Sequence, residues 1–223
     1  NNSTLDDESF YQSLKDIVFS TPRTATTKFF NQLFGGRRSK SVLGDLVAVM
    51  LNNSMYTYKV AGPMVGVEKE IIKEICNMIG YGNMSDGTIA TGGSMSNFMA
   101  MVMARDAAKA ELTRAGVEQK MIVYTSEASH YSIAKNAALI GVGRDQVRYI
   151  KTDDHGKMMP EELEKQIVAD KAEGFLPFFV NATAGTTVMG AFDDIKAASA
   201  VCKSHNVWLH VDGAYCGAVI FSE

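Results

Sequence analysis

Residues 178–215 read FFVNATAGTTVMGAFDDIKAASAVCKSHNVWLHVDGAY and contain a strand, a helix and a second strand in succession. The apolar run Phe178–Ala182 predicts the first strand, and Val207–Val211 predicts the second. The helix is predicted from about Ile195 to His205, and Asp194 is its candidate N-cap. A helix between two short apolar strands is typical of a parallel sheet.

The same alternation of strand and helix extends upstream of this unit. Three further strands are predicted, at 88–90, 121–125 and 147–150. Each is followed by a predicted helix, at about 94–115, at about 131–140 and from Pro160 onward. The pattern therefore predicts an α/β fold, with a mostly parallel sheet that carries helices on both faces. In such a sheet, ligands bind at the loops beyond the carboxyl ends of the strands.

The first part of the chain has a different character. Residues 1–62 have a polar start and an apolar stretch at Val42–Leu51 but no strand signals, so they are interpreted as an arm plus a helix. From Pro63 onward, apolar residues recur at helical spacing and predict an amphipathic helix that ends at Gly80. We therefore divide the chain into residues 1–62 and residues 63–223.

Composition limits the classes of function. The chain has 223 residues, of which 46% are hydrophobic and 21% charged, and this predicts a soluble globular protein. The formal net charge is -3, and the longest basic cluster is Arg37-Arg38 with Lys40 nearby. Nucleic acid is therefore not an expected partner.

Neither a membrane segment nor a cysteine framework is indicated. No apolar run reaches the roughly 18 to 20 residues of a membrane-spanning helix, and the N-terminus is polar rather than signal-like. We expect a cytoplasmic protein without a membrane partner. Cys76, Cys202 and Cys216 are widely spaced and form no CxxC pair, so no disulfide framework and no metal site are expected.

Two loops that open helices are candidates for ligand binding. Residues 91–97 read TGGSMSN, and a glycine-rich loop before a helix N-terminus stabilises a phosphate. The alternative for this turn is a structural helix cap. Residues Ser129–Ser132 place His130 at the mouth of the sheet, where an imidazole stacks on a flat ring or relays a proton. The alternative there is a histidine bonded to a neighbouring hydroxyl.

Two further loops follow the last predicted strands. Residues 183–193 contain small residues and hydroxyls, which suit hydrogen bonds to a cofactor or form a Thr-rich turn. Asp212 ends the last apolar strand, where an acid is costly to bury unless it meets a cation such as a protonated pyridine nitrogen. The alternatives are a helix cap and a metal carboxylate, although no acidic or histidine partner stands at a ligand-like spacing.

Taken in order, these loops resemble those of the group II pyridoxal-phosphate-dependent amino-acid decarboxylases, the glutamate, cysteine-sulfinate and aspartate decarboxylase kind. The resemblance runs from about Phe29 to Ser222. The motifs that carry it are Phe30–Leu33, Tyr56–Tyr58, Gly92–Ser94, Ser129–Ser132, Ala182–Thr187, Gly190–Asp193 and His210–Asp212. It implies the large domain of a PLP-dependent transferase-like protein of fold type I, present here as an incomplete portion, and a homodimer.

The resemblance also implies a site for pyridoxal 5'-phosphate. The cofactor-binding residues it implies are Gly93, Ser94, His130, Thr187, Asp212 and Ala214. Gly93 and Ser94 would hold the phosphate, and His130 and Ala214 would lie against opposite faces of the ring. Asp212 would keep the pyridine nitrogen protonated, so that the ring accepts electrons when carbon dioxide leaves. The catalytic residues implied are His130 and Asp212.

The segment around Asn31 and Gln32 carries the substrate expectation. In relatives that act on acidic amino acids a similar Phe-Asn-Gln segment lines the substrate pocket, and an amide such as Gln32 donates a hydrogen bond to a carboxylate or sulfinate. Residues 1–62 would thus contribute to the substrate pocket and to dimer packing, and residues 63–223 would begin the cofactor-binding domain. Thr26-Thr27 replaces a frequent His-Pro, and Gly213–Tyr215 replaces the usual Ala-Ala-Trp.

The family's Schiff-base lysine is expected after the aspartate matched by Asp212, and no lysine follows Asp212 in this sequence. We therefore expect an N-terminal fragment that decarboxylates nothing by itself, while the full-length enzyme acts on glutamate, cysteine sulfinate or aspartate. The alternatives are an aminotransferase or carbon–carbon lyase of the same fold, and a non-catalytic homologue. The lysine would discriminate the last of these from an enzyme.

Overall fold

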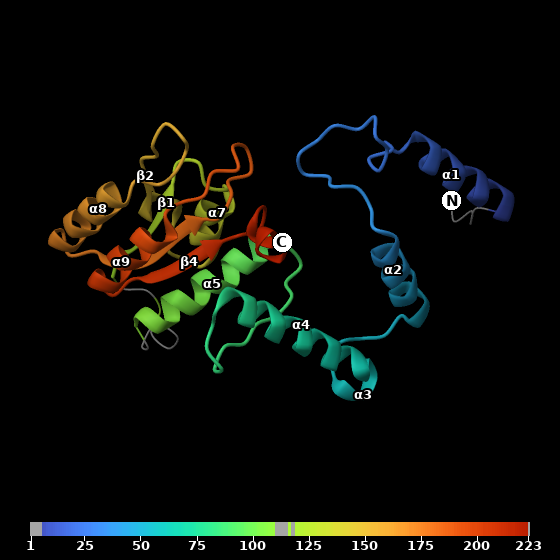
Figure 1. The fold of residues 1–223 in the computed structure, drawn as a ribbon, viewed down its shortest axis with the longest axis horizontal. Helices are drawn as coiled ribbons and strands as arrows, with labels where there is room; N and C mark the ends of the chain where they lie inside the picture. Colours follow the sequence, from blue (N-terminus) through green and yellow to red (C-terminus); the bar gives the residue numbers. More distant parts are fainter. Residues whose placement is uncertain (1–5, 110–115, 117–118, 223) are drawn as a thin grey trace. The chain divides into compact units, whose positions relative to one another are not determined.

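A computed structural model describes residues 6–109, 116 and 119–222. The chain forms two compact units, Asn1–Val65 and Gly66–Glu223, and each is described by itself. The second unit contains a sheet with helices packed against it (Figure 1).

The sheet of the second unit is parallel throughout. Its strands are β1 (Met121–Ser126), β2 (Val147–Ile150), β3 (Leu176–Thr183) and β4 (Trp208–Asp212), in the spatial order β2-β1-β3-β4. All three neighbouring pairs are parallel. The predicted α/β class and the parallel sheet are therefore confirmed, and the connections between these strands run through helices as parallel pairing requires.

Helices cover both faces of this sheet (Figure 1). One layer contains α5 (Gly93–Ala108) and α7 (Ser132–Leu139), and the other contains α8 (Pro160–Ala172) and α9 (Ile195–His205). Two short 3-10 helices, η1 and η2, span Arg144–Gln146 and Gly217–Phe221.

Alternate side chains of the central strand β1 enter two separate cores. Met121 and Val123 pack with the α5 and α7 layer, while Ile122 and Tyr124 pack with the α8 and α9 layer. This period of two is the geometry of a strand, and it explains why all of β1 is buried. Asp170 of α8 ties the second layer to the sheet, because it accepts hydrogen bonds from Tyr124 Oη at 2.9 Å and Arg148 Nε at 3.0 Å.

Most predicted elements of this unit are confirmed, with two corrections. Thr88–Ala90 is not a strand in the structure, and it pairs with none of the four strands. Ile89 is 64% exposed, so this short run has neither the burial nor the ladder partner that a strand needs. The helix predicted to reach 115 ends at Ala108, and residues 110–115 lie outside the described part of the chain.

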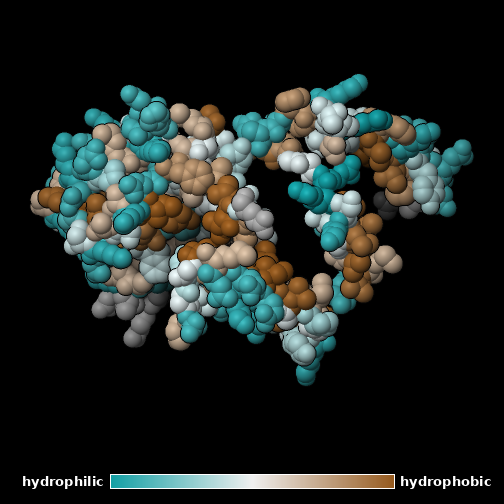
Figure 2. Space-filling view, viewed as in Figure 1, coloured by the Kyte–Doolittle hydropathy of each residue, from teal (hydrophilic) through white to brown (hydrophobic). Residues whose placement is uncertain are grey.

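The first unit is helical. Its helices are α1 (Asp7–Ser20), α2 (Ser39–Leu51) and α3 (Tyr58–Ala61), and α4 (Pro63–Ile79) crosses from it into the second unit. The helices expected at 42–51 and from Pro63 are confirmed, whereas α1 was not predicted. Figure 2 shows hydrophobic residues along α2, none of which is buried. No helix among residues 6–109 and 119–222 has the length and apolar character to cross a membrane.

We predict that Ile167→Ala in α8 lowers the free energy of unfolding by about 2 to 5 kcal/mol, because Ile167 has no exposed surface and its loss leaves a cavity. Val168, the next residue, is 51% exposed and provides the matched control, with an expected change within about 0.5 kcal/mol for Val168→Ala. Urea denaturation of the two variants measures both values. Equal effects would contradict the assignment of Ile167 to the core.

Candidate active site

The candidate site lies at the carboxyl ends of β1, β3 and β4. The strand register pairs Thr125 with Asn181 and Thr183 with Asp212, so the three strands end at one edge of the sheet. The loops after these strands and the first turns of α5 and α7 meet at the same edge through the side-chain bonds described below. This is the edge at which a parallel α/β sheet binds its ligands.

Asp212 is a buried carboxylate that the structure holds with neutral donors. It is 7% exposed, its Oδ2 accepts from Asn97 Nδ2 at 2.9 Å, and its Oδ1 accepts from the backbone N–H of Ala214 at 3.0 Å. In the part of the chain that the structure describes, no lysine or arginine forms an ion pair with Asp212. A buried acid with this donor set suits a cationic ligand group, such as a protonated ring nitrogen.

His130 is linked to Asp212 through two intermediate residues, Asn97 and Ser132. Asn97 Nδ2 also donates to Ser132 Oγ at 3.0 Å, and the Ser132 N–H donates to His130 Nδ1 at 3.2 Å. Because Nδ1 accepts a hydrogen bond, the proton of a neutral His130 ring lies on Nε2. The half-buried imidazole therefore lies at the same strand edge as Asp212.

The start of α5 packs tightly on the loop after β4. A Cβ atom at Gly93 would lie 2.8 Å from the Cβ of Ala214, so only glycine fits at this approach. On the opposite side, Asn136 Nδ2 of α7 donates to the Ser94 carbonyl at 2.9 Å. The N–H groups of Met95 and Ser96 donate to the Gly92 carbonyl at 2.9 and 3.1 Å, so those of Gly93 and Ser94 lie at the open end of the helix. A phosphate is stabilised at such a terminus. Gly93, Ser94 and Ala214 thus meet at one place.

The loop that carries Thr187 is held by its neighbours. Thr186 Oγ1 accepts from the Ala191 N–H at 3.1 Å, and Thr187 beside it is half-buried. Gly185 has φ +90°, and a side chain there would overlap Cys216. Position 185 therefore requires glycine for two reasons: its backbone is in the left-handed region, and Cys216 leaves no room for a side chain.

Asp193 lies at the end of the same loop and connects it to β3 by hydrogen bonds. Its carboxylate accepts from the backbone N–H groups of Met158 and Thr183, both at 2.7 Å. Burial raises the pKa of Asp193 above its ordinary value, and these two hydrogen bonds oppose the shift. The bond to Thr183 fixes the end of β3 beside Asp212.

A cluster of polar side chains supports the turn before His130. Ser129 Oγ lies 2.8 Å from Ser126 Oγ and 3.1 Å from Thr183 Oγ1, and Asn181 Nδ2 donates to Thr125 Oγ1 at 3.2 Å. Asn181 is fully buried. Ser129 and Thr183 belong to loops that the sequence analysis singled out. Thr125, Ser126 and Asn181 carried no expectation, because each is a polar residue at the end of an otherwise apolar strand.

Asn97 and His210 are two further site residues to which the sequence analysis assigned no role. His210 Nε2 and Asn97 Oδ1 are 2.8 Å apart, and the His210 ring stacks on Phe179 with centroids 5.5 Å apart. Asn97 belongs to the buried stripe of α5 together with Ala100, Met101 and Ala104. A polar residue within a helical stripe of buried apolar residues is the sequence signal that identifies it.

The pKa of His210 is shifted by its surroundings. Burial lowers the pKa of His210 below its ordinary value, and the negative charge of Asp212 opposes this shift. The neutral ring is thus the form that the fold favours, and it donates Nε2–H to the Asn97 carbonyl oxygen.

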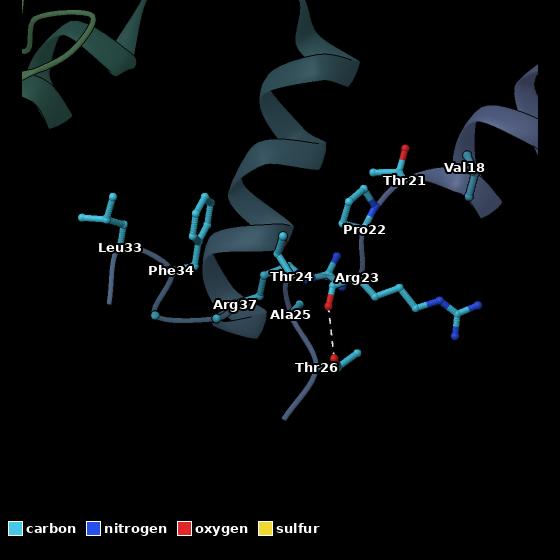
Figure 3. Close-up of a pocket in the computed structure, with 12 residues that line it drawn as sticks. Val18, Thr21, Pro22, Arg23, Thr24, Ala25, Thr26, Leu33, Phe34 and Arg37 are labelled. Carbon is cyan, nitrogen blue, oxygen red and sulfur yellow. Dashed lines mark hydrogen bonds between the residues drawn. The ribbon is translucent and has the colours of Figure 1, made fainter. Parts of the chain in front are cut away.

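Asn31 and Gln32 lie in the first unit, and their predicted substrate role stays a prediction. Asn31 Oδ1 accepts from the Leu33 N–H at 2.8 Å. A pocket of about 560 Å³ in this unit is lined by residues 18, 21–26 and 33–37, and neither Asn31 nor Gln32 contributes to it (Figure 3). Within the described ranges, no group of three or more His, Cys, Asp or Glu residues is arranged to hold a metal ion.

The parallel sheet and the polar site at its strand ends define an α/β protein of the cofactor-binding class. The Pyridoxal-dependent decarboxylase conserved domain matches residues 3–223. The chain therefore belongs to the pyridoxal-dependent decarboxylase family, which confirms the resemblance stated from the motifs. Pyridoxal phosphate is confirmed as the cofactor of this family of carboxy-lyases.

Individual relatives agree with this assignment. The chain is 40% identical to the cysteine sulfinic acid decarboxylase of Mus musculus over 97% of this chain and 44% of the mouse protein. It is 38% identical to the acidic amino acid decarboxylase GADL1 of Xenopus tropicalis, over 97% of this chain and 42% of that protein. The crystal structure of mouse CSAD matches with a TM-score of 0.95 and 39% identity, covering 100% of this chain and 48% of the mouse chain.

These likenesses confirm the PLP-dependent transferase-like fold and a chain that is partial relative to its relatives, since it spans less than half the length of each. The predicted roles of individual site residues, and of the segments 1–62 and 63–223, stay predictions. The structure brings Gly93, Ser94, His130, Asp212 and Ala214 to one edge of the sheet.

We predict that acid destabilises the fold through His210. The pKa of His210 in the folded protein lies below the ordinary value of 6.5, so the unfolded chain takes up a proton at a higher pH than the folded chain. The free energy of unfolding is therefore highest above about pH 6.5, and it falls as the pH drops from there to the folded pKa. His210→Gln is expected to reduce this loss, measured as the free energy of unfolding between pH 7.5 and about 5. His155→Gln, at an exposed position, is the control and is expected to keep the wild-type slope. An unchanged slope in His210→Gln would contradict the interpretation.

Proposed function

We propose that the complete protein containing this chain is a pyridoxal-phosphate-dependent decarboxylase of acidic L-amino acids. Cysteine sulfinate is the first candidate substrate, and glutamate and aspartate are the others. Cysteine sulfinic acid decarboxylases and an acidic amino acid decarboxylase among the relatives support this class of substrate. The single structural observation that carries the proposal is the buried Asp212 carboxylate. Within the described residues, it accepts hydrogen bonds from neutral donors only.

The residues at the strand edge fit the cofactor. Gly93 and Ser94 at the α5 N-terminus would hold its phosphate with their N–H groups and the positive end of the helix dipole. His130 and Ala214 would lie on opposite faces of its ring, and Thr187 would contact it from the loop after β3. The exclusion of a side chain at Gly93 supports this arrangement, since the backbone of α5 must approach both Ala214 and the ligand.

Asp212 supplies the decisive electrostatic contact. When bound, the cofactor accepts into its ring the electron pair left by the departing carboxylate. Asp212 would hold a proton on the ring nitrogen, because a buried carboxylate without another cation stabilises a positive charge beside it. His130, whose Nδ1 accepts from the Ser132 N–H, would present a flat ring and its Nε2–H donor to the site.

The first unit supplies the proposed substrate contact. Gln32 carries an amide, which donates hydrogen bonds to a carboxylate or sulfinate oxygen and selects acidic side chains. Asn31 shapes the same segment, because its side chain folds back onto the Leu33 N–H. Both residues are proposed to line the pocket of the assembled enzyme, a homodimer.

The first test of the proposed function is decarboxylation by the purified full-length protein. We expect release of carbon dioxide from L-cysteine sulfinate, L-glutamate or L-aspartate and none from L-tryptophan, measured with carboxyl-labelled substrates. Asp212→Ala is expected to lower kcat by a factor of about 10³ or more, since electrostatic groups at reacting centres contribute on this order. The control is Asp153→Ala in an exposed turn, with turnover near the wild-type value. Near-normal turnover in Asp212→Ala, or the absence of turnover with all acidic substrates, would refute the proposal.

The substrate contact has its own prediction. Gln32→Ala is expected to raise KM for the acidic substrate by about tenfold while kcat changes by less than about twofold, because the amide binds the part of the substrate that does not react. Cofactor affinity, followed by fluorescence, serves as the control and is expected to stay constant. A fall in kcat at constant KM would assign Gln32 to the reacting centre instead.

A further inference from the structure

Asn97 lies at the centre of the candidate site and bonds to three polar side chains. It is 3% exposed, and its contacts reach Asp212 on β4, Ser132 on α7 and His210 on β4. Along the sequence, Asp212 is 115 residues away, Ser132 is 35 and His210 is 113. A single amide therefore connects the start of α5 with the strand end and with the next helix.

The chemistry of the partners fixes the orientation of this amide. A carboxylate oxygen can only accept, so the NH₂ group of Asn97 faces Asp212 and its oxygen faces His210. The two N–H bonds are used by Asp212 Oδ2 and Ser132 Oγ, and Oδ1 accepts from His210 Nε2–H. The reverse orientation would place two oxygens against each other at 2.9 Å. Asn97 thus has one stable arrangement.

This arrangement restrains Asp212 without neutralising it. The Ala214 N–H holds Oδ1 and Asn97 holds Oδ2, so both ends of the carboxylate are fixed. An uncharged amide leaves the negative charge available to a cation, whereas a lysine or arginine at the same place would compensate it. Fixed donors of this kind preorganise a charged group before its ligand arrives.

We propose that Asn97 is a positioning residue, which orients the Asp212 carboxylate toward the ring nitrogen of the cofactor and thereby sets the affinity for a protonated pyridine ring. The inference rests on the proposed function, in which Asp212 contacts that nitrogen. It assigns to Asn97 an effect that acts through Asp212 alone. The effect must therefore disappear when the cofactor has no ring nitrogen.

The experiment compares two cofactors in the full-length protein freed of its own cofactor. One is pyridoxal 5'-phosphate, and the other is its 1-deaza analogue, in which C–H replaces the ring nitrogen. Asn97→Leu is expected to weaken binding of pyridoxal phosphate by about tenfold or more, because a hydrogen bond to a buried charged group is lost. Binding of the analogue is expected to change by less than about twofold. Fluorescence titration measures both dissociation constants.

Asn136 provides a matched control, since it is also a buried asparagine, 3% exposed, that bonds between α5 and α7. Its amide holds the Ser94 carbonyl, on the phosphate side. Asn136→Leu is therefore expected to weaken the binding of both cofactors by the same factor. Equal weakening of the two cofactors by Asn97→Leu would show a general structural role and overturn the inference, as would unchanged binding of both.

Two further variants keep the outcome decisive. If Asn97→Leu does not fold, as judged by circular dichroism, Asn97→Ser removes the amide with a smaller polar side chain, and the same criteria apply. Asp212→Asn separates the two proposals, because it is expected to abolish the preference for pyridoxal phosphate over the analogue. Loss of preference in Asp212→Asn but not in the Asn97 variant refutes the positioning role alone. An unchanged preference in Asp212→Asn refutes the contact on which the proposed function depends.

Discussion

The burial of one carboxylate at the end of β4 is the constraint on which the site depends. An ionised acid away from water is costly unless it is hydrogen-bonded and meets a positive charge. Asp212 has hydrogen bonds on both oxygens, yet its described partners are neutral. The negative charge of Asp212 is therefore not compensated by a positive charge among its described partners. Such a group is more easily explained by a ligand than by stability, and the family assignment supplies a cofactor with a basic ring nitrogen.

The parallel sheet makes this arrangement possible because it delivers several loops to one edge. β3 and β4 run side by side up to the Thr183 and Asp212 pair, and β1 ends beside β3. Two separate hydrophobic cores hold the sheet between its helix layers. The strand ends are thus positioned by packing that lies away from the site, and the polar groups at the edge do not have to supply the stability of the fold.

Much of the fold could be predicted from the sequence, because apolar strands and amphipathic helices leave a local pattern. The strand at 147–150 and the helix opened by Pro160 depend mainly on their own residues. The prediction of a strand at Thr88–Ala90 was wrong, because three residues of suitable type do not indicate whether a neighbouring strand is available for pairing. Asp212 and His130 were predicted from motifs, whereas the role of Asn97 was not. The contacts of Asn97 are with residues in distant segments of the chain, and a local sequence pattern does not contain them.

The neutral character of the contacts around Asp212 agrees with the proposed role of this carboxylate as the partner of a cationic ligand. A lysine in place of Asn97 would stabilise the carboxylate in the folded protein, but it would also compete with the cofactor for the same charge. An apolar residue there would leave Asp212 Oδ2 without its donor and His210 Nε2–H without an acceptor. An amide satisfies both neighbours and adds no charge. The lowered pKa of His210 fits the same proposal, because a protonated imidazole so near Asp212 would compensate the negative charge that the proposed ligand contact requires.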